Sequence, residues 1–479
     1  MRRLAKLGGM LLGLLIFCLI ISPVGVLANG LPQLGAVEPV VSGENLEFVL
    51  VVTGDVAPKL VQYTNPSKVI LELPGLALQP GIILPQLDHP AVQSVRLSRD
   101  SHGVKLAIDL RYAVPRAQVV RESAERLRLV IPIVFEEATT ARVAPGVYYT
   151  QLTRGTPAGP LEINVLRIDP VVSQVQVETR LANNRTLGRA PLSKIAAEAG
   201  ALAAINGSFF GSDGTPLGLF IQDGRLVTEP IFDRTAVAIT GSGEILITQF
   251  NFSGAVTLGP YELPISGLNR QRYTNELILY TPDRGESTRT NNFGRELVII
   301  DGVVAAIYDG DAPIPEHGYV LSGHGVFKEL FSAIDIGTPC AVHLTTDPDW
   351  RELDIRFALG AGPLLVADGQ VRITAAAERF QSDVVNGRAP RTAFGVTKDG
   401  KLIAVTVNGR LEGISMGMTL EELAELMIDL GCEQALNLDG GGSATMVIRN
   451  RPLNMPSDGK ERQVASGIVF KVNLDKGSF

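Results

Sequence analysis

Short runs of alternating apolar and polar residues dominate residues 37–135. They are rich in β-branched side chains and are separated by Asn-Pro, Pro-Gly and Ser-His-Gly turn sequences. A period of two is typical of strands that bury one face, and no convincing helical pattern lies among them. The polar, Thr/Ala-rich residues 136–145 end in Pro-Gly and predict a linker. We therefore predict a small all-β sandwich, with strands at residues 46–52, 59–73, 94–97 and 104–110.

Strands also dominate residues 146–472, but two helices stand out. Thr419 and Glu422 form a capping box before an apolar helix face, and Gly431 follows the helix as its closing residue. An Ala-rich helix ending at residue 199 is closed by Gly200 in the same way. The pattern predicts an α+β fold, in which a strand-rich domain carries only a few helices.

The segments after the two helices are similar. Asn206 and Asn437 each lie six residues beyond the closing glycine, after a short apolar strand. We predict pseudo-repeated halves whose strand ends converge on one cleft, because sites are commonly built from strand-end loops. The other echoing pairs are 219–224 with 364–369 and 234–236 with 391–393.

The N-terminus has the pattern of a secretory signal peptide. Three basic residues precede an apolar stretch at 11–21, and a small-residue cleavage pattern ends at Ala28. We expect residues 1–28 to be removed and the mature chain to be secreted or held in the cell envelope. The alternative is an uncleaved anchor, because the apolar stretch at 7–27 approaches bilayer-spanning length. No second apolar run is that long.

Charge and cysteine content exclude other classes. The chain has 43 Lys+Arg and 50 Asp+Glu, so its net charge of -7 becomes -10 when the signal's three basic residues leave. Without a basic block, a nucleic-acid partner is not expected. Three cysteines exclude a disulfide scaffold, and Cys340 and Cys432 either pair or remain buried thiols. No zinc-ligand spacing occurs and no metal is indicated, although exported acidic loops can bind Ca²⁺.

The strongest chemical motif is Asn437-Leu438-Asp439-Gly440-Gly441-Gly442-Ser443-Ala444-Thr445. Strand alternation places Asn437 and Asp439 on the same face. The three glycines let the backbone adopt positive φ and approach a ligand closely, exposing N–H donors, and Ser443 and Thr445 add hydroxyls. The set suits an anionic or sugar ligand, and the alternative is an ordinary Asp-Gly turn with a glycine bulge.

Three further places carry candidate side chains. Asn206 and Ser208 offer an amide and a hydroxyl beside two phenylalanines. Arg391 opens an apolar strand and could hold an oxyanion in bidentate fashion, or lie in a surface loop. Asn408 and Arg410 end the next strand, where they belong to a site or to a hairpin turn.

Five stretches, taken together and in this order, resemble the phosphodiester glycosidase family. They are residues 204–210, 360–365, 390–396, 417–424 and 438–443. The resemblance covers about residues 145–472. It implies an enzyme that hydrolyses a sugar-1-phosphodiester, releasing the sugar and leaving a phosphomonoester on the partner.

Roles follow from that chemistry. A glycosyl phosphate has a good leaving group, so the site must mainly stabilise an oxocarbenium-like centre, activate water or a nucleophile, and hold the phosphodiester. We expect Asp439 near the anomeric carbon, Arg391 with the glycine amides and Ser443 on the phosphate, and Glu378 as a second carboxylate. Asn206 and Asn437 would orient sugar hydroxyls.

One position departs from the family. Asn408 stands where the family usually has the aspartate of Asp-Gly-Arg. Asparagine cannot act as a general acid or base, so activity depends on whether this position is catalytic or only binds sugar.

A second resemblance concerns the N-terminal part. Residues 63–75 are similar to the AMIN domain of exported cell-wall amidases and secretion proteins. The resemblance implies attachment to a cell-wall polymer, and a purely structural β-domain is the alternative. For the whole chain, the competing hypothesis is a non-catalytic envelope protein that binds wall polymer or exopolysaccharide through both domains.

Overall fold

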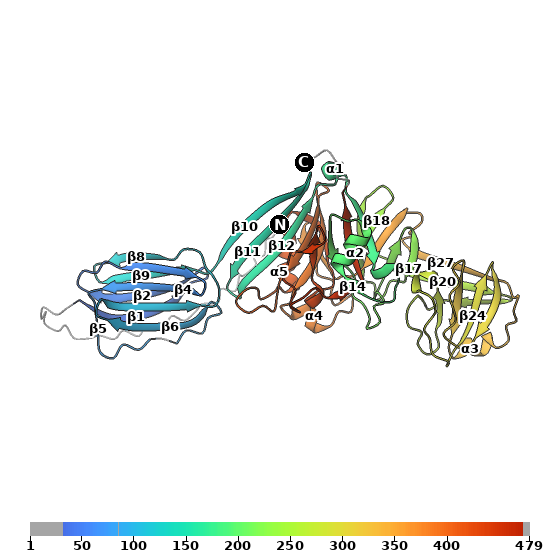
Figure 1. Ribbon diagram of the computed structural model, residues 1–479, viewed down its shortest axis with the longest axis horizontal. Helices are drawn as coiled ribbons and strands as arrows, with labels where there is room; N and C mark the ends of the chain where they lie inside the picture. Colours follow the sequence, from blue (N-terminus) through green and yellow to red (C-terminus); the bar gives the residue numbers. More distant parts are fainter. Residues whose placement is uncertain (1–31, 85, 473–479) are drawn as a thin grey trace, which may run out of the picture.

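The computed structural model describes residues 32–84 and 86–472. The expected signal peptide, residues 1–28, lies outside them. Figure 1 shows three parts along the longest axis: an N-terminal part, a central part and an outer lobe. Strands form most of each part and helices are few, so the strand-rich fold expected from the pattern is confirmed.

The N-terminal part consists of two antiparallel-rich sheets that share one hydrophobic core. Apolar residues from both sheets, among them Phe48, Leu71 and Leu129, are fully buried in it. The first sheet has the order β5 (Ala77–Leu78), β1 (Gln33–Val41), β2 (Asn45–Thr53), β9 (Arg126–Pro132), β8 (Gln118–Ser123); the second has β3 (Lys59–Thr64), β4 (Ser67–Pro74), β7 (Gly103–Leu110), β6 (Val92–Asp100).

An eight-stranded sheet forms the centre of the molecule. Alternate residues of its strands face two separate cores, as Phe394 and Ala393 illustrate. Helix α5 (Leu420–Asp429) covers one face. The strand order is β10 (Phe135–Ala144), β11 (Val147–Thr156), β12 (Gly159–Ile168), β32 (Leu402–Val407), β31 (Arg391–Thr397), β33 (Cys432–Asn437), β29 (Leu364–Ala367), β30 (Gln370–Val371).

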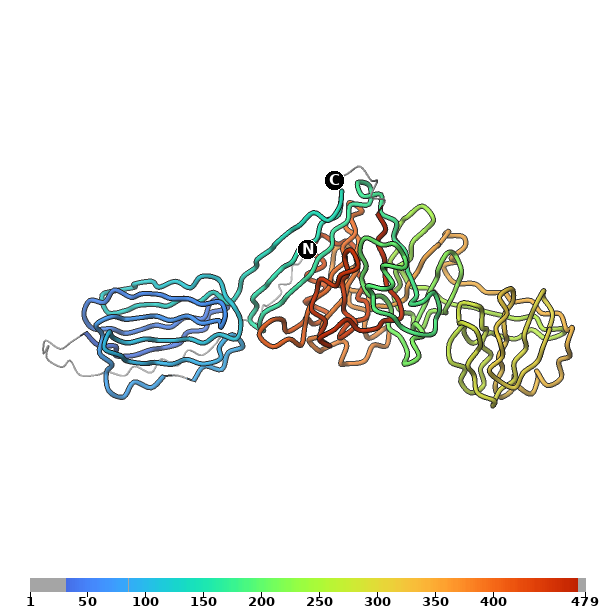
Figure 2. Tube along the Cα trace, viewed as in Figure 1, coloured from blue at the N-terminus to red at the C-terminus, as the bar shows by residue number. Residues whose placement is uncertain are grey.

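The other face packs against two further sheets. Figure 2 shows the C-terminal strands running through the central part beside segments from much earlier in the chain, and β37 pairs with both β13 and β15. One sheet is β13 (Gln176–Leu181), β37 (Ser466–Lys471), β15 (Ala203–Asn206), β34 (Met446–Ile448), β35 (Arg451–Pro452); the other is β17 (Arg225–Thr228), β16 (Phe220–Gln222), β28 (Ile355–Gly360), β18 (Thr235–Thr240), β19 (Ile245–Gln249).

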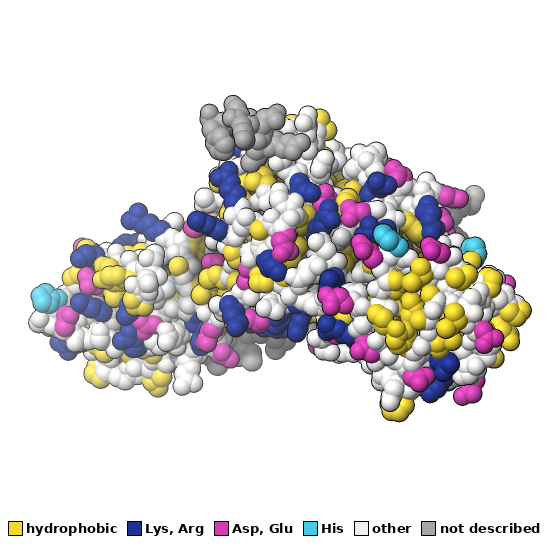
Figure 3. Space-filling model, turned by 45° about the vertical axis from the view of Figure 1, so that its right-hand side comes forward, with side chains coloured by type: hydrophobic (Ala, Val, Ile, Leu, Met, Phe, Trp, Pro, Cys, Tyr) yellow, Lys and Arg dark blue, Asp and Glu magenta, His cyan; other side chains and the backbone are white. Residues whose placement is uncertain are grey.

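The outer lobe, residues 251–347, was not expected as a separate part. Its core continues into the central part, because residues such as Phe331 and Ala238 belong to one buried cluster. Figure 3 shows apolar side chains gathered on one face of the lobe, while charges of both signs are interspersed elsewhere on the visible surface. Its sheets are β21 (Tyr261–Pro264), β20 (Asn251–Leu258), β27 (Cys340–Asp347), and β22 (Gly267–Leu268), β23 (Leu277–Tyr280), β26 (Gly318–Gly323), β24 (Arg295–Ile300), β25 (Val303–Tyr308).

The helix signals read from the sequence are confirmed. Thr419 and Glu422 form the capping box of α5, and Gly431 follows its C-cap at φ 91°. Helix α2 (Leu192–Ala199) ends at Gly200, which is left-handed at φ 66°. The remaining short elements are β14 (Ala190–Pro191), β36 (Gln463–Val464), α1 (Pro170–Ser173), η1 (Ala182–Asn184), η2 (Pro282–Arg284), α3 (Val326–Phe331), α4 (Ser382–Asn386) and η3 (Gly441–Ser443).

The prediction of a linker at residues 136–145 is wrong. These residues form most of β10, which pairs with β11 over its whole length. Nearly all its side chains are exposed, because β10 is an edge strand held by main-chain hydrogen bonds, so its composition resembles a linker.

Two smaller points concern cysteines and membranes. Cys340 and Cys432 are buried free thiols and do not form a disulfide with each other. Within residues 32–84 and 86–472, no helix has the length and apolar character needed to cross a bilayer.

Candidate functional site

Three strand-end loops meet around Asp439. The Asn206 side chain, at the end of β15, donates through Nδ2 to the Asp439 carbonyl at 2.6 Å. The Asp439 N–H donates back to the Gly207 carbonyl at 3.0 Å, and the Leu438 N–H donates to Thr392 on β31 at 2.8 Å. The two asparagine-ended strands, β15 and β33, therefore do converge on one place.

Asp439 carries the perturbed carboxylate of this cluster. Burial raises its pKa to about 6, while the Ser443 hydroxyl, the positive charge of Arg462 and the Gly440 N–H act in the opposite direction. Ser443 Oγ nevertheless makes no hydrogen bond of regular geometry with any residue that the structure describes. With few donors on it, the carboxylate is held at a pKa suited to proton transfer near neutral pH.

The glycines after Asp439 serve turn geometry and packing. Gly441 has a φ of 60°, and its N–H donates to the Pro390 carbonyl at 2.9 Å, so that amide is not free for a ligand. A Cβ on Gly442 would overlap the ion pair between Asp458 and Arg462. Gly442 does allow a close approach to the backbone, as expected from the sequence. The group that approaches it is this ion pair from a later loop and not a ligand.

The cations around the loop differ from the expected set. Arg391 is buried, and its guanidinium donates through Nε to the Met418 carbonyl and through Nη2 to the carbonyls of Val384 and Gly387, at 2.7–2.9 Å. Burial, with a smaller contribution from Arg410, lowers its pKa to about 10. Arg391 thus does not offer the free bidentate fork expected of it.

Two other arginines face the glycine loop. Arg410 is exposed, and its Nη1 lies 3.5 Å from the position of a Cβ on Gly441. Arg462 is paired with Asp458 at 2.7 Å and acts electrostatically on Asp439. Arg462 was missed in the sequence: the four-residue spacing to Asp458 is visible there, but nothing local indicates that this polar loop folds back over residue 442.

Most amide and hydroxyl groups expected on the sugar are used by the fold. Asn206 Oδ1 accepts from Thr392 Oγ1 at 2.7 Å and from the Thr445 N–H at 3.0 Å. Ser208 Oγ lies 2.8 Å from Ser466 Oγ, and Asn437 Nδ2 donates to the Gly362 carbonyl at 3.0 Å. Among described residues, the buried side-chain atoms left without a hydrogen bond here are Asn437 Oδ1, Ser443 Oγ and Thr445 Oγ1.

Asn408 joins three segments at the end of β32. Its Nδ2 donates to Glu162 Oε2 at 3.2 Å and its Oδ1 accepts from the Met455 N–H at 3.1 Å. Its carbonyl accepts from Ser415 Oγ at 2.6 Å. Both faces of the amide are therefore engaged, and the amide donor suits the Glu162 carboxylate where an aspartate would repel it.

Glu378 lies in a separate, closed environment. Its side chain has no exposed surface and accepts from the Thr235 N–H at 3.0 Å, Thr235 Oγ1 at 2.7 Å and the Leu364 N–H at 3.0 Å. The Thr374 hydroxyl is a fourth, very close donor. A Cβ on Gly362 would overlap this carboxylate, so glycine there leaves room for it. Glu378 fastens strands together and has no described contact with Asp439.

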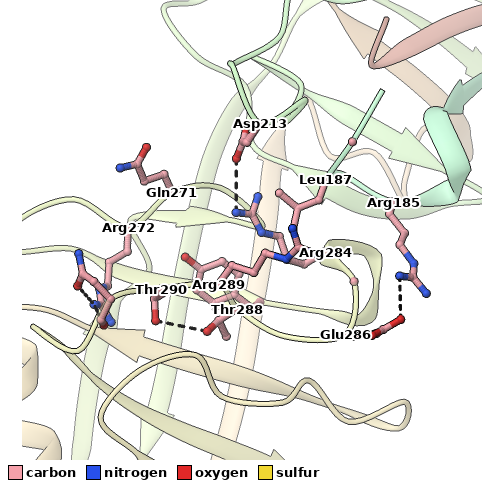
Figure 4. A pocket seen from close by; sticks show the side chains of 14 residues that line it. Arg185, Leu187, Asp213, Gln271, Arg272, Arg284, Glu286, Thr288, Arg289 and Thr290 are labelled. Atoms are coloured by element: carbon pink, nitrogen blue, oxygen red, sulfur yellow. Dashed lines mark hydrogen bonds and ion pairs between the residues drawn. The ribbon is translucent and has the colours of Figure 1, made fainter. Parts of the chain in front are cut away.

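Cavities and metal ligands add two observations. A cavity of about 610 Å³ lies elsewhere, between residues 185–188 and 271–291, and includes no member of the Asp439 cluster (Figure 4). No group of three or more His, Cys, Asp or Glu within the described ranges is placed to hold a metal ion.

Comparison with known families supports part of the sequence reading. Residues 293–471 match the family model of phosphodiester glycosidases. This range contains Asp439, Glu378, Arg391 and Arg410, and begins inside the outer lobe.

Matches to curated relatives are short. A Bacillus subtilis protein of an SPbeta prophage, uncharacterised, is 40% identical over 86 residues, 18% of this chain and 13% of that protein. An N-acetylglucosamine-1-phosphodiester alpha-N-acetylglucosaminidase from Bos taurus is 40% identical over 74 residues, 15% of this chain and 14% of the enzyme. The chain thus aligns with only about one seventh of the length of these relatives.

Two solved structures are similar over nearly the whole chain. A hypothetical protein from Synechocystis has a TM-score of 0.64 and 24% identity, covering 93% of this chain and 82% of that one. A protein from Burkholderia pseudomallei K96243, provisionally described as exported, has a TM-score of 0.58 and 22% identity, covering 93% and 97%. At these identities the likeness concerns the fold alone.

Proposed function

Taking residues 293–471 as a phosphodiester glycosidase domain, we propose that this chain hydrolyses a sugar-1-phosphodiester in a cell-envelope or extracellular glycan. The observation that carries the proposal is Asp439, a carboxylate with a pKa raised to about 6 at the junction of three strand-end loops. The name of the bovine relative gives the substrate class, an N-acetylglucosamine-1-phosphodiester.

The reaction needs little acid catalysis. A phosphomonoester is a good leaving group, so the bond between the anomeric carbon and the phosphate oxygen breaks without a strong proton donor. At pH 7 a carboxyl group with a pKa of about 6 is ionised in roughly nine-tenths of molecules. Asp439 in this form stabilises the oxocarbenium-like centre and accepts a proton from the attacking water, whose oxygen stays on the sugar.

The phosphodiester is held mainly by Arg410, because Arg462 is already paired with Asp458. Arg410 is exposed beside Gly441, and Arg462 lies above Gly442. Ser443 and Thr445 have buried hydroxyls without regular partners among the described residues. A guanidinium binds a phosphodiester oxygen well, and fixed dipoles in a partly buried site strengthen this binding. Arg391 orients the loops through their carbonyls and lies behind these groups.

Glu378 is assigned a positioning role. All of its hydrogen-bond donors come from the protein, and its side chain does not reach solvent. Retaining and inverting glycosidases usually use two carboxylates, but an activated leaving group lessens the need for the second, and Asp458 beside Gly442 is paired with Arg462. The same observation favours the second candidate function, a glycan-binding protein without catalysis.

The cellular setting is part of the proposal. The signal-peptide pattern of residues 1–28 supports export, and residues 37–135, with their AMIN-like sequence, are proposed to attach the chain to a cell-wall polymer. The provisional description of the Burkholderia protein as exported supports the same setting.

The experiment uses the chain without residues 1–28 and a synthetic N-acetylglucosamine-1-phosphodiester in ¹⁸O-labelled water. The proposal requires free sugar with ¹⁸O at the anomeric carbon and an unlabelled phosphomonoester. Label in the phosphate would place cleavage on the phosphorus side. Saturable binding of the diester with no released sugar would establish the binding protein instead.

A further inference from the structure

The polar cavity of Figure 4 lies between the central part and the outer lobe. Its volume is about 610 Å³, within the range of sites that hold a small ligand. The loop after η1 and the loop from η2 to residue 291 form its walls (Figure 4). A main-chain bond joins these two loops, since the Thr186 N–H donates to the Asp283 carbonyl, and the Gly188 N–H donates to the carbonyl of Asp213 in a third loop.

Arginine side chains dominate the wall. In Figure 4, Arg185 enters from one side and Arg272 from the other, with Arg284 and Arg289 between them. Hydroxyl and amide groups complete the lining, from Thr288, Thr290, Asn291, Gln271 and Tyr280. This composition suits an anionic, hydroxyl-rich ligand better than an apolar one.

Two of these arginines are buried and fixed by their terminal nitrogens. Arg272 donates from Nη1 to Ser322 Oγ at 2.6 Å and from Nη2 to Asn291, and 7% of it is exposed. Arg284 donates from Nη1 to Thr215 Oγ1 and the Asn269 carbonyl, both at 2.8 Å, and 4% of it is exposed. The Nε atoms of both are buried without a hydrogen-bond partner among the described residues.

The carboxylates near the cavity neutralise three of its four arginines. Asp213 lies 3.6 Å from Arg284 and Glu286 lies 3.3 Å from Arg185. Behind the wall, the buried Glu296 is 3.8 Å from Arg272 and also accepts from Thr288 and Thr290. Each of these three acids therefore faces its own arginine.

Arg289 is the remaining cation. It is exposed and forms no ion pair with any residue in the described part of the chain. The Asp311 carboxylate binds its main-chain N–H. Burial, assisted by repulsion from Arg289, lowers the pKa of Arg284. Tyr280 and Asp213 act against this lowering, and a bound anion would add to their effect by offsetting the repulsion between the two guanidinium groups.

We propose that this cavity binds a phosphate group, free or carried by a sugar, at Arg284 and Arg289. The exposed guanidinium fork of Arg289 matches phosphate oxygens in charge and geometry, and Arg284 adds the N–H of its unpartnered Nε from the same loop. The hydroxyl- and amide-lined remainder of the cavity takes the sugar. The site is separate from Asp439 and does not depend on the proposed hydrolysis.

Calorimetric titration of the chain without residues 1–28 tests this inference. Inorganic phosphate, N-acetylglucosamine 1-phosphate and neutral N-acetylglucosamine are the three probes. Tighter binding of the sugar phosphate than of phosphate identifies a sugar-phosphate site, equal binding identifies a phosphate site, and both support the proposal. Absence of binding by either anion, or binding by the neutral sugar equal to theirs, overturns it.

Arg289→Asn is the informative variant, because asparagine tolerates the left-handed backbone of this position, φ 52°, while removing the charge. We expect the affinity for phosphate to fall about tenfold or more. Arg356→Ala, which removes an exposed arginine on β28, is the matched control and should bind as the unaltered chain does. Unchanged affinity in Arg289→Asn contradicts the proposal, as does loss of binding in Arg410→Ala alone, which would place the anion at Asp439.

Discussion

Asp439 and Glu378 are two carboxylates in one domain with opposite surroundings. Glu378 has no exposed surface, and four protein donors point at its oxygens. Asp439 lies at a partly accessible strand end, where burial raises its pKa to about 6 and few donors compensate.

The difference separates a structural from a reactive carboxylate. Donors from the protein stabilise Glu378 and connect the start of β18 to the start of β29, so a substrate would have to displace them. Asp439 keeps acceptor capacity and a pKa near neutrality, which is the state that a general base requires. Two properties therefore distinguish these carboxylates: the exposure of the side chain and the number of donors that the fold supplies.

The largest expected effect is on turnover in Asp439→Asn. We expect kcat on a sugar-1-phosphodiester to fall about 10³-fold, because the variant cannot accept a proton or carry negative charge. Asp368→Asn is the matched control, since Asp368 is exposed and left-handed at φ 53°, a backbone that asparagine accepts.

The same variant should not lose stability. A carboxyl group whose pKa is raised in the folded state destabilises the fold above that pKa, and the penalty disappears as the pH falls from about 6 toward 3.8. Asp439→Asn should therefore raise the free energy of unfolding at pH 7 by about 1–2 kcal/mol, the range left after discounting for partial exposure. Denaturant titration that instead shows a loss of stability would identify Asp439 as structural.

Glu378→Gln should affect stability where Asp439→Asn affects rate. Glutamine replaces one carboxylate oxygen with an NH2 group, so the protein donors that faced this oxygen lose their acceptor and stay buried and unpaired. We expect the free energy of unfolding to fall by about 2–4 kcal/mol. The folded fraction should keep kcat within about threefold of the unaltered chain, since this residue does not touch substrate. A thousandfold loss of kcat in fully folded Glu378→Gln would reverse the assignment.

Arg410→Ala should weaken binding more than turnover. Removing an exposed guanidinium beside the glycine loop costs about 1.5–3 kcal/mol of phosphodiester binding. KM should rise roughly tenfold or more, with a smaller change in kcat. Arg356→Ala serves as the control, and equal KM values in the two variants would remove Arg410 from the site.

Asn408→Asp should have the smallest effect. The new carboxylate would face Glu162, which now accepts from Asn408 Nδ2 at 3.2 Å, and the Met455 N–H would keep its acceptor. We expect about 1 kcal/mol of lost stability from repulsion and a change in kcat of less than about threefold. A large gain in kcat would show that this position is catalytic and that asparagine limits the activity.

Local features were predictable from the sequence because their causes are local. The capping box of Thr419 and Glu422 and the glycine ends of α2 and α5 depend on residues within one helical turn. Both echoing Asp-Gly pairs, at 223–224 and 368–369, have positive φ and turn a hairpin. The convergence of the Asn206 and Asn437 strand ends was also anticipated, from the shared pattern before them.

Partner choice was not predictable, because it depends on residues far apart in the chain. Asn206 was expected to meet a sugar, but Thr392, 186 positions later, occupies its oxygen. Ser208 is similarly engaged by Ser466. The edge strand β10 was missed for a different reason, because an exposed strand carries the composition of a loop.

The pH dependence of kcat/KM for an N-acetylglucosamine-1-phosphodiester tests the assignment of Asp439 most directly. If ionised Asp439 is required, kcat/KM should be constant above neutrality and fall tenfold per pH unit below about pH 6. The residual activity of Asp439→Asn should lack this acidic limb. A profile that is flat through pH 6, or a limb that persists unchanged in Asp439→Asn, would contradict the assignment of Asp439 as the reactive carboxylate.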